Sequence, residues 1–229
     1  MNQFSQLITE TITLLQPLSP ELHVLPAEIA YISRAEQQGE LSLKNQFLNV
    51  AGVGELRSAT LSSAKIEIAN FLFFPETDTQ TPVYAAEFVC LSEKPIVAVI
   101  DAKCLLTGSE EQTVSGLLQQ ARKQINYLSP ETEMSAWYLE SRSGNDIFVR
   151  SPSMEQLTEL MQLHLQIWQA LMELFSKPQP CNPQQARLHT QKLQHYKNQH
   201  RLNYPGVPLL NRSFGEVWTE NYLKNYLFG

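Results

Sequence analysis

The sequence contains little that would mark a membrane protein, a secreted protein or a metalloprotein. No apolar run approaches the roughly 18 residues that a membrane helix needs. The N-terminal segment MNQFSQLITETITLLQ has neither the basic start nor the continuous apolar stretch of a signal peptide. Cys90, Cys104 and Cys181 form no CxxC pair, and their odd number argues against a disulfide framework and a structural zinc site. We therefore expect a soluble cytoplasmic protein.

Familiar catalytic and ligand-binding motifs are also absent. The sequence has no GxGxxG fingerprint, no GxxxxGK[ST] phosphate loop, no HExxH zinc motif and no GxSxG nucleophile motif. The five histidines include no HxH or HxxxH pair on an apolar face, and His164 falls on the apolar stripe of a helix, as a core histidine would. The sequence therefore predicts no metal site and no cofactor held by a standard phosphate loop.

Acidic residues are missing from one long stretch, although the net charge of the chain is -6. No Asp or Glu occurs between Leu174 and Gly215. The cations there are Lys177, Arg187, Lys192, Lys197, Arg201 and Arg212. Such a basic segment is either a solvated helix face or a surface that attracts phosphates or acidic proteins. No RNA-binding or helix-turn-helix motif accompanies it, so we do not expect nucleic acid as the partner.

The apolar pattern predicts an antiparallel sheet between helices, in one α+β domain over residues 1–229. Helical spacing or composition predicts helices over 2–15, 110–127, 154–175, 183–200 and 216–228. Short segments rich in Val, Ile, Phe and Thr predict strands near 28–33, 41–50, 56–62, 66–74, 83–91 and 95–104. WYLES and DIFVRS suggest a further hairpin. The short connections make the sheet mostly antiparallel.

One charged residue interrupts the strand VYAAEFVCL, residues 83–91. Period-two counting places Glu87 on one face with Val83, Ala85 and Val89, and the opposite face is apolar too. Burying a lone carboxylate costs on the order of several kcal/mol unless it is paired or protonated. Glu87 is therefore at a sheet edge, satisfied by an arginine or a backbone amide, or buried for a chemical purpose.

Three stretches taken together resemble the ferredoxin-dependent bilin reductases, the family of phycocyanobilin:ferredoxin oxidoreductase and the phycoerythrobilin and phytochromobilin synthases. They are NFLFFPETDTQTPVYAAEFV, IVAVIDAK and SFGEVWTENYLKNYLF, and LPAEIAYIS and DIFVRSPS extend the likeness over most of the chain. The resemblance implies a three-layer α/β/α sandwich that binds an open-chain tetrapyrrole between the sheet and the C-terminal helices. It also implies a monomer with no tightly bound metal or flavin, single electrons from reduced ferredoxin and protons from acidic side chains.

The resemblance also implies roles for particular residues. Glu87 occupies the position of an aspartate that donates protons to the bilin, with one methylene more. Asn70 occupies a position that is histidine in one branch and asparagine in others, where an amide orients a pyrrole or a water. In the stretch Arg201-Leu202-Asn203-Tyr204-Pro205, Tyr204 stands where a second catalytic aspartate is usual. Asn203 and Tyr204 would line the pocket, and Arg201 and Arg212 are candidates to bind the bilin propionates.

These features predict reduction of biliverdin or dihydrobiliverdin to a phycobilin through bilin radicals, with Glu87 as proton donor. Segment 177–212 would serve partly as a docking surface for ferredoxin. Two alternatives stay open. The chain is a bilin carrier that has lost reductase activity, or it reduces a chlorophyll-derived linear tetrapyrrole, as the related red chlorophyll catabolite reductase does with a glutamate as acid. The resemblance leaves open which double bond is reduced and whether two or four electrons are transferred.

Overall fold

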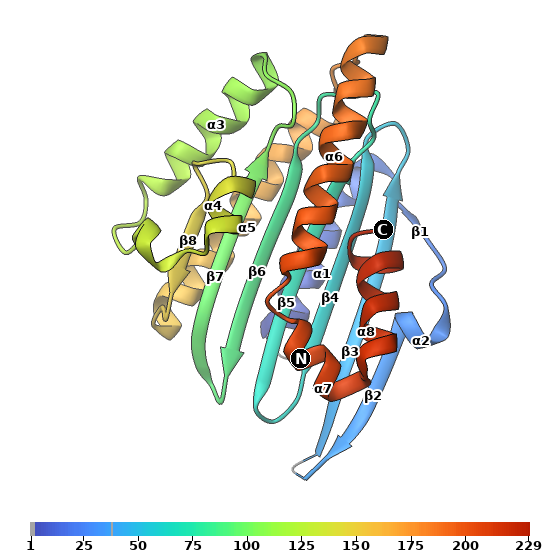
Figure 1. Ribbon diagram of the computed structural model, residues 1–229. Coiled ribbons are helices and arrows are strands. Elements are labelled where there is room, and N and C mark those ends of the chain that lie inside the picture. The colour runs from blue at the N-terminus through green and yellow to red at the C-terminus, as the bar shows by residue number, and fades with distance from the viewer. Residues whose placement is uncertain (1–2, 38) are drawn as a thin grey trace.

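The structure, a computed structural model, describes residues 3–37 and 39–229, and its centre is one antiparallel sheet (Figure 1). The strand order is β1-β3-β4-β5-β6-β7-β8, and β2 also pairs with β3. The strands are β1 (Glu21–Leu22), β2 (Tyr31–Glu36), β3 (Gly39–Val50), β4 (Gly54–Ser62), β5 (Ile66–Pro75), β6 (Val83–Leu91), β7 (Lys94–Lys103) and β8 (Ile147–Arg150). β3 to β7 follow one another in sequence and in space, as the predicted hairpins require.

Helices cover both faces of the sheet, which confirms the α+β class and the three-layer sandwich. The helices are α1 (Gln3–Leu15), α2 (Ala27–Ala30), α3 (Ser109–Arg122), α4 (Ala136–Ser141), α5 (Met154–Phe175), α6 (Pro183–Asn203), α7 (Val207–Phe214) and α8 (Glu216–Tyr222), which continues as a π-helical turn (Leu223–Leu227). α1, α3 and α5 pack on one face, whereas α6, α7 and α8 pack on the other (Figure 1). No helix in the described ranges is long and apolar enough to cross a bilayer.

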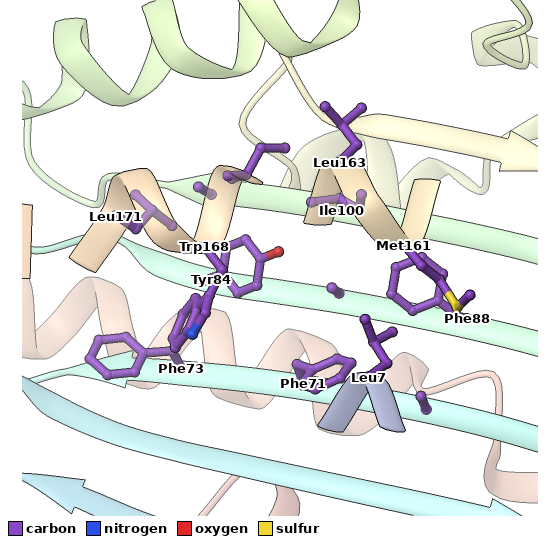
Figure 2. Packing of buried hydrophobic residues seen from close by; sticks show 14 of the residues in the cluster. Leu7, Phe71, Phe73, Tyr84, Phe88, Ile100, Met161, Leu163, Trp168 and Leu171 are labelled. Carbon is purple, nitrogen blue, oxygen red and sulfur yellow. The ribbon is translucent and has the colours of Figure 1, made fainter. Parts of the chain in front are cut away.

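The larger hydrophobic core lies between the sheet and α1, α3 and α5 (Figure 2). α5 begins at Ser153 with a capping box, because the Ser153 side chain accepts from the Gln156 backbone N–H and Gln156 bonds back. Its buried stripe faces the apolar side chains of the central strands. The largest fully buried members include Phe4, Phe71, Phe73, Tyr84, Phe88, Trp168 and Phe175. This core fixes the far side of β6, so Glu87 is left on the opposite face.

His164 is fully buried in this core and makes two hydrogen bonds. The Thr11 hydroxyl already donates to the Leu7 carbonyl at 2.8 Å, so in its 2.9 Å contact it accepts from Nε2–H of His164. Nδ1 must then accept from the Tyr84 hydroxyl at 2.6 Å. Burial lowers the pKa of His164 to about 3, so the ring is neutral. The prediction of a core histidine is confirmed.

The smaller hydrophobic core lies under α6, α7 and α8. The tyrosines of the C-terminal segment anchor it to the sheet: the Tyr222 hydroxyl donates to Asn45 Oδ1 at 2.9 Å, and the Tyr226 hydroxyl lies 2.9 Å from the Ser58 carbonyl. On this side, Lys197 of α6 is buried and donates to the Gly229 carbonyl at 2.6 Å. Lys197, which the sequence groups with the surface cations, therefore contributes nothing to a basic surface.

Two predicted elements each have one wrong boundary. The segment 28–33 begins as the short helix α2, in which the Ile29 and Ala30 N–H groups bond to the Pro26 carbonyl, and becomes a strand only at Tyr31. The helix expected over 110–127 ends at Arg122. The residues after it, Ile125 and Tyr127 among them, leave the helix and pack against the larger core. Tertiary contacts therefore override the local pattern in both segments.

WYLES was expected to form a hairpin with DIFVRS, and this prediction is wrong because residues 136–141 form α4. The Tyr138 hydroxyl donates to Asp146 Oδ2 at 3.0 Å, and the ring of Trp137 packs edge-on against His200 of α6 with centroids 5.3 Å apart. These partners lie outside the segment, so its own pattern did not reveal them. Within DIFVRS, residues Ile147–Arg150 do form a strand, β8, which pairs with β7 instead.

Candidate active site

Glu87 lies on a central strand, half-buried, and faces α6. Its backbone is opposite Asn70 on β5 and Val99 on β7. Glu87 Oε1 accepts hydrogen bonds from Asn70 Nδ2 at 3.2 Å and from the Tyr204 hydroxyl at 3.3 Å. No ion pair in the described part of the chain involves Glu87. Neither an edge position nor an arginine partner therefore accounts for this acid.

The environment of Glu87 favours the protonated carboxyl. Burial raises the pKa of Glu87, and the hydrogen bonds from Asn70 and Tyr204 lower it only in part. An acid with a raised pKa holds a proton closer to neutral pH, where it can transfer that proton to a basic intermediate. The Oδ1 atom of Asn70 is buried and has no hydrogen-bond partner, so this amide retains an acceptor at the site.

Tyr204 closes the space over Glu87. It is the residue at which α6 ends, and its ring packs against Phe228 with centroids 5.8 Å apart. Gly206 lies so close that a Cβ atom there would come within 2.5 Å of the Tyr204 ring. Burial, followed by the charge of Glu87, raises the pKa of Tyr204 well above its usual value. Tyr204 therefore keeps its proton and acts as a hydrogen-bond donor to the acid.

Two of the cavities of the described structure adjoin the site on the face of the sheet that α6 covers. The first, about 30 Å³, is lined by Asn70, Tyr204 and apolar side chains of β3, β4 and α7, and has room for one water molecule. The second, about 530 Å³, lies between the end of β7, α4 and α6, and Lys103, Trp137 and Tyr196 line it. Of these two, only the second has the size of an ordinary ligand site. Glu87 is not among the residues that line either of these two cavities.

The sequence matches one family model, that of the ferredoxin-dependent bilin reductases, over residues 8–229. The chain belongs to this family. It is therefore an enzyme of the ferredoxin-dependent bilin oxidoreductase class, as the resemblance of its motifs predicted, and a divergent member. The match includes the strand with Glu87 and the C-terminal helices that cover it.

Curated relatives and a solved structure agree with this membership. The chain is 24% identical to phycocyanobilin:ferredoxin oxidoreductase of Trichodesmium erythraeum over 92% of its own length and 86% of the relative. It is 26% identical to phycoerythrobilin:ferredoxin oxidoreductase of Prochlorococcus marinus, with 89% and 85% covered. Tomato phytochromobilin synthase in complex with biliverdin has the same fold, with a TM-score of 0.81 and 18% identity over 99% of this chain and 83% of that one.

The other predicted site residues of this bilin reductase have hydrogen-bond partners other than the acid. Asn203 donates to the Gln199 carbonyl inside α6 at 2.8 Å, and Arg201 donates to Asn198 Oδ1 at 3.3 Å. Arg212 is exposed on α7, where its carbonyl accepts from Arg34. Of the predicted site residues, the described hydrogen bonds therefore bring Asn70, Glu87 and Tyr204 together, whereas Asn203, Arg201 and Arg212 have other partners.

The structure also places a second buried acid on this face, Asp101 of β7. β7 pairs with β6 so that Asp101 is opposite Ala85 and Val99 is opposite Glu87. Ala85 and Glu87 are two residues apart and share a face, so Asp101 shares that face too. The sequence motif IVAVIDAK already contained the signal, a lone acid in an apolar strand, which is the same signal that identified Glu87.

Proposed function

We propose that this bilin reductase reduces biliverdin or dihydrobiliverdin to a phycobilin and that Glu87 donates a proton to a bilin radical. The observation that carries the proposal is an acid on a central strand, hydrogen-bonded by Asn70 and Tyr204 and without an ion-pair partner. When a one-electron transfer makes the bound bilin more basic, the nearest protonated carboxyl supplies the proton. We propose one bilin-reductase-like domain over residues 1–229, cytoplasmic and monomeric, with no tightly bound cofactor.

Asn70 and Tyr204 have supporting roles in this proposal. The free Oδ1 atom of Asn70 accepts a hydrogen bond from a pyrrole N–H or an ordered water, while its amide nitrogen holds the acid in place. Tyr204 covers Glu87 until the substrate displaces it. Asn203 and Arg201 then lie at the end of α6 near the opened pocket, and Arg212 is a candidate to hold a propionate carboxylate.

Electrons come from reduced ferredoxin, and we propose that it docks on the basic segment 177–212. Lys177, Arg187, Lys192 and Arg212 are exposed there, and the segment itself contains no Asp or Glu. An acidic electron-transfer protein is attracted to such a surface over a distance of about one Debye length, roughly 8–10 Å at physiological salt. The larger cavity opens beside the same helix, so the electron donor and the substrate would approach from neighbouring sides.

An anaerobic absorption time course of biliverdin IXα with the protein, ferredoxin and a ferredoxin-reducing system tests the proposal. We expect a bound-bilin spectrum, a long-wavelength radical band and a blue-shifted product that chromatography identifies. In Glu87→Gln the bound spectrum should persist, whereas radical decay should slow by about 10²-fold or more, the usual contribution of a general acid. The exposed Glu36→Gln serves as a control and should react as the wild type does. Radical decay in Glu87→Gln at the wild-type rate contradicts the role of Glu87.

The carrier is the second candidate, because Tyr204 replaces an acid and the space beside Asn70 holds only a water-sized cavity of about 30 Å³. A carrier gives a stable bound spectrum that reduced ferredoxin does not change. The third candidate is a reductase of a chlorophyll-derived linear tetrapyrrole. The same experiment with such a substrate tests it, since that enzyme would reduce this substrate and leave biliverdin unchanged.

A further inference from the structure

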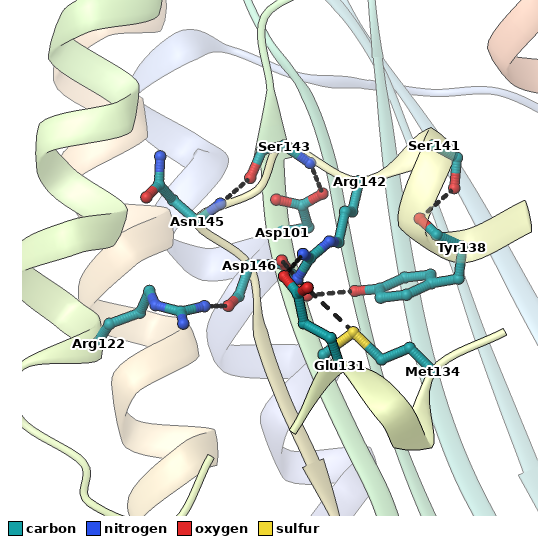
Figure 3. A network of polar contacts seen from close by, with 10 residues as sticks. All are labelled: Asp101, Arg122, Glu131, Met134, Tyr138, Ser141, Arg142, Ser143, Asn145 and Asp146. Carbon is teal, nitrogen blue, oxygen red and sulfur yellow. Dashed lines mark hydrogen bonds and ion pairs between the residues drawn. The ribbon is translucent and has the colours of Figure 1, made fainter. Parts of the chain in front are cut away.

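One carboxylate oxygen of Asp101 holds a loop in place, and the other has no hydrogen-bond partner. One oxygen, Oδ2, accepts the Ser143 backbone N–H at 2.9 Å and so holds the loop that joins α4 to β8. The other oxygen, Oδ1, is buried and has no hydrogen-bond partner, and Figure 3 shows only the Ser143 contact at this carboxylate. A buried polar atom without a partner costs stability, so its retention calls for a reason.

The position of Asp101 suggests that reason. Its backbone neighbour on β6, Ala85, is two residues from Glu87 on the same face. Diagonal positions on adjacent antiparallel strands are about 7–8 Å apart. Lys103, two residues further along β7, lines the 530 Å³ cavity. Asp101 therefore lies between Glu87 and the larger cavity, on the sheet face that α6 covers.

The groups around Asp101 keep its carboxyl protonated at higher pH than usual. Burial raises the pKa of Asp101 to about 6, and Asp146 adds to the rise, whereas Ser143 and Lys103 oppose it. No cation in the described part of the chain forms an ion pair with Asp101. The neighbouring Arg142 pairs with Glu131 and Asp146 instead. The titratable groups on its own side of the sheet are Lys103 of β7, Tyr138 of α4, Tyr196 of α6 and, through the loop, Asp146. Tyr84 of β6 points to the opposite face, and the charge of Asp101 adds to the rise in its pKa.

We propose that Asp101 is a second acid of the bilin site and supplies the proton that Tyr204 cannot. The inference rests on the proposed reduction. A tetrapyrrole that extends from Glu87 toward the larger cavity lies beneath Tyr196, His200 and Tyr204, which follow one another at four-residue spacing along α6. When α6 separates from the sheet to admit this substrate, Oδ1 of Asp101 faces one of its pyrrole rings.

The two acids account for the protons of one reduction. Reducing one double bond of the bilin takes two electrons and two protons, and reduced ferredoxin, a one-electron iron–sulfur donor, supplies the electrons in two steps. Glu87 gives one proton and Asp101 gives the other, each as a carboxylic acid that becomes a carboxylate. Two C–H bonds form across the reduced double bond, and both carboxylates regain protons from solvent before the next turnover.

Asp101→Asn tests this role with little change to the fold, because the Asn side-chain oxygen still accepts the Ser143 N–H and the amide replaces the unpartnered oxygen. In a single-turnover anaerobic experiment with biliverdin IXα, we expect normal binding and normal formation of the first radical. The second protonation should slow by about 10²-fold, so that a half-reduced species accumulates. Asp101→Glu, which restores a carboxyl, should recover part of the rate. Wild-type turnover in Asp101→Asn overturns the inference.

Asp146→Asn is a matched control, since Asp146 is a fully buried carboxylate of the same polar network that bonds to Arg142 and Tyr138 (Figure 3). Asp146 contributes only part of the raised pKa of Asp101, so this variant should lower stability and slow the second protonation by no more than about threefold, far less than Asp101→Asn does. In the wild type, that step should slow as pH rises through about 6, and a flat profile between pH 5 and 8 overturns the inference without any variant. A wild type that binds biliverdin and reduces none overturns the proposed function as well, whereas normal turnover in Asp101→Asn overturns only the role of Asp101.

Discussion

Asp101 shows how a single residue makes stability depend on pH. The folded-state pKa is about 6, above the ordinary value of 3.8 that applies to the unfolded chain. The folded state therefore binds the proton more tightly, and the free energy of unfolding falls as pH rises from about 4 to about 6. The full effect is about 3 kcal/mol, at 1.36 kcal/mol per pKa unit. His164, with a pKa of about 3, acts with the opposite sign and destabilises the fold as pH falls below about 6.5.

We predict that Asp101→Asn removes the fall in stability that Asp101 causes. Between pH 4 and pH 7, Asp101 should cost the wild type about 2–3 kcal/mol in the free energy of unfolding. The variant should not show this loss. Urea unfolding at both pH values measures this difference. His164 contributes equally to both proteins, so its effect cancels in the comparison. Parallel pH dependences for the two proteins would mean that Asp101 has an ordinary pKa.

Among the structural elements, the junction of α6 and α7 decides whether Glu87 is covered. Asn182 caps the start of α6 by accepting the Gln184 and Gln185 backbone N–H groups, so the long helix begins at a defined residue. At its other end, Tyr204 turns onto Glu87 and Gly206 packs against the tyrosine ring. The φ angle of -75° at Gly206 suits any residue. Close packing, and not backbone conformation, therefore requires glycine there.

We predict that Gly206→Ala displaces the Tyr204 ring and destabilises the protein by about 1–3 kcal/mol, the usual cost of overpacking. The same substitution in a Tyr204→Ala background has no ring to meet, so it should be neutral or stabilising by up to about 1 kcal/mol. Tyr204→Phe retains the ring and should retain the penalty. Chemical denaturation of the six proteins, with Gly or Ala at position 206 and Tyr, Phe or Ala at position 204, measures the coupling. Equal effects of Gly206→Ala in the wild-type and Tyr204→Ala backgrounds would contradict the packing explanation.

At the scale of the whole molecule, charge is distributed unevenly. The basic, acid-free segment occupies α6 and its flanking residues, while the rest of the chain is acidic. Arg187 is exposed near the start of α6, and Lys94 is exposed at the start of β7. The start of α6 and the start of β7 lie at opposite ends of the sheet (Figure 1). These two cations allow a comparison of charge removal at the proposed docking surface with the same change elsewhere.

We predict that Arg187→Glu lowers kcat/KM for reduced ferredoxin by about tenfold at low salt, because steering by complementary charge accelerates encounter. The loss should shrink as ionic strength rises and screening shortens the interaction. Lys94→Glu changes the net charge equally and should have a much smaller effect. Bilin affinity should be unchanged in both variants. Equal losses in the two variants would show that net charge, and not the basic segment, determines the rate.

The sequence alone determined the layered sheet, because short β-rich segments with short connections leave little choice but consecutive antiparallel pairing. Glu87 was also predictable, since an acid in an apolar strand breaks the period-two pattern whatever surrounds it. The same break in the apolar pattern occurs at Asp101 in the strand IVAVIDAK. Family motifs linked Glu87, Asn70 and Tyr204, although these residues are up to 134 positions apart.

Only the tertiary structure decided what each of these residues touches. WYLES became a helix because Trp137 and Tyr138 find partners on α6 and before β8, and local pattern does not encode such contacts. Lys197 of the basic segment is buried, because the 3.6-residue period of α6 points this cation toward the sheet. The hydrogen bond from Tyr204 to Glu87 and the unpartnered oxygen of Asp101 depend on how α6 lies across β6 and β7, which is set by packing between segments far apart in the chain.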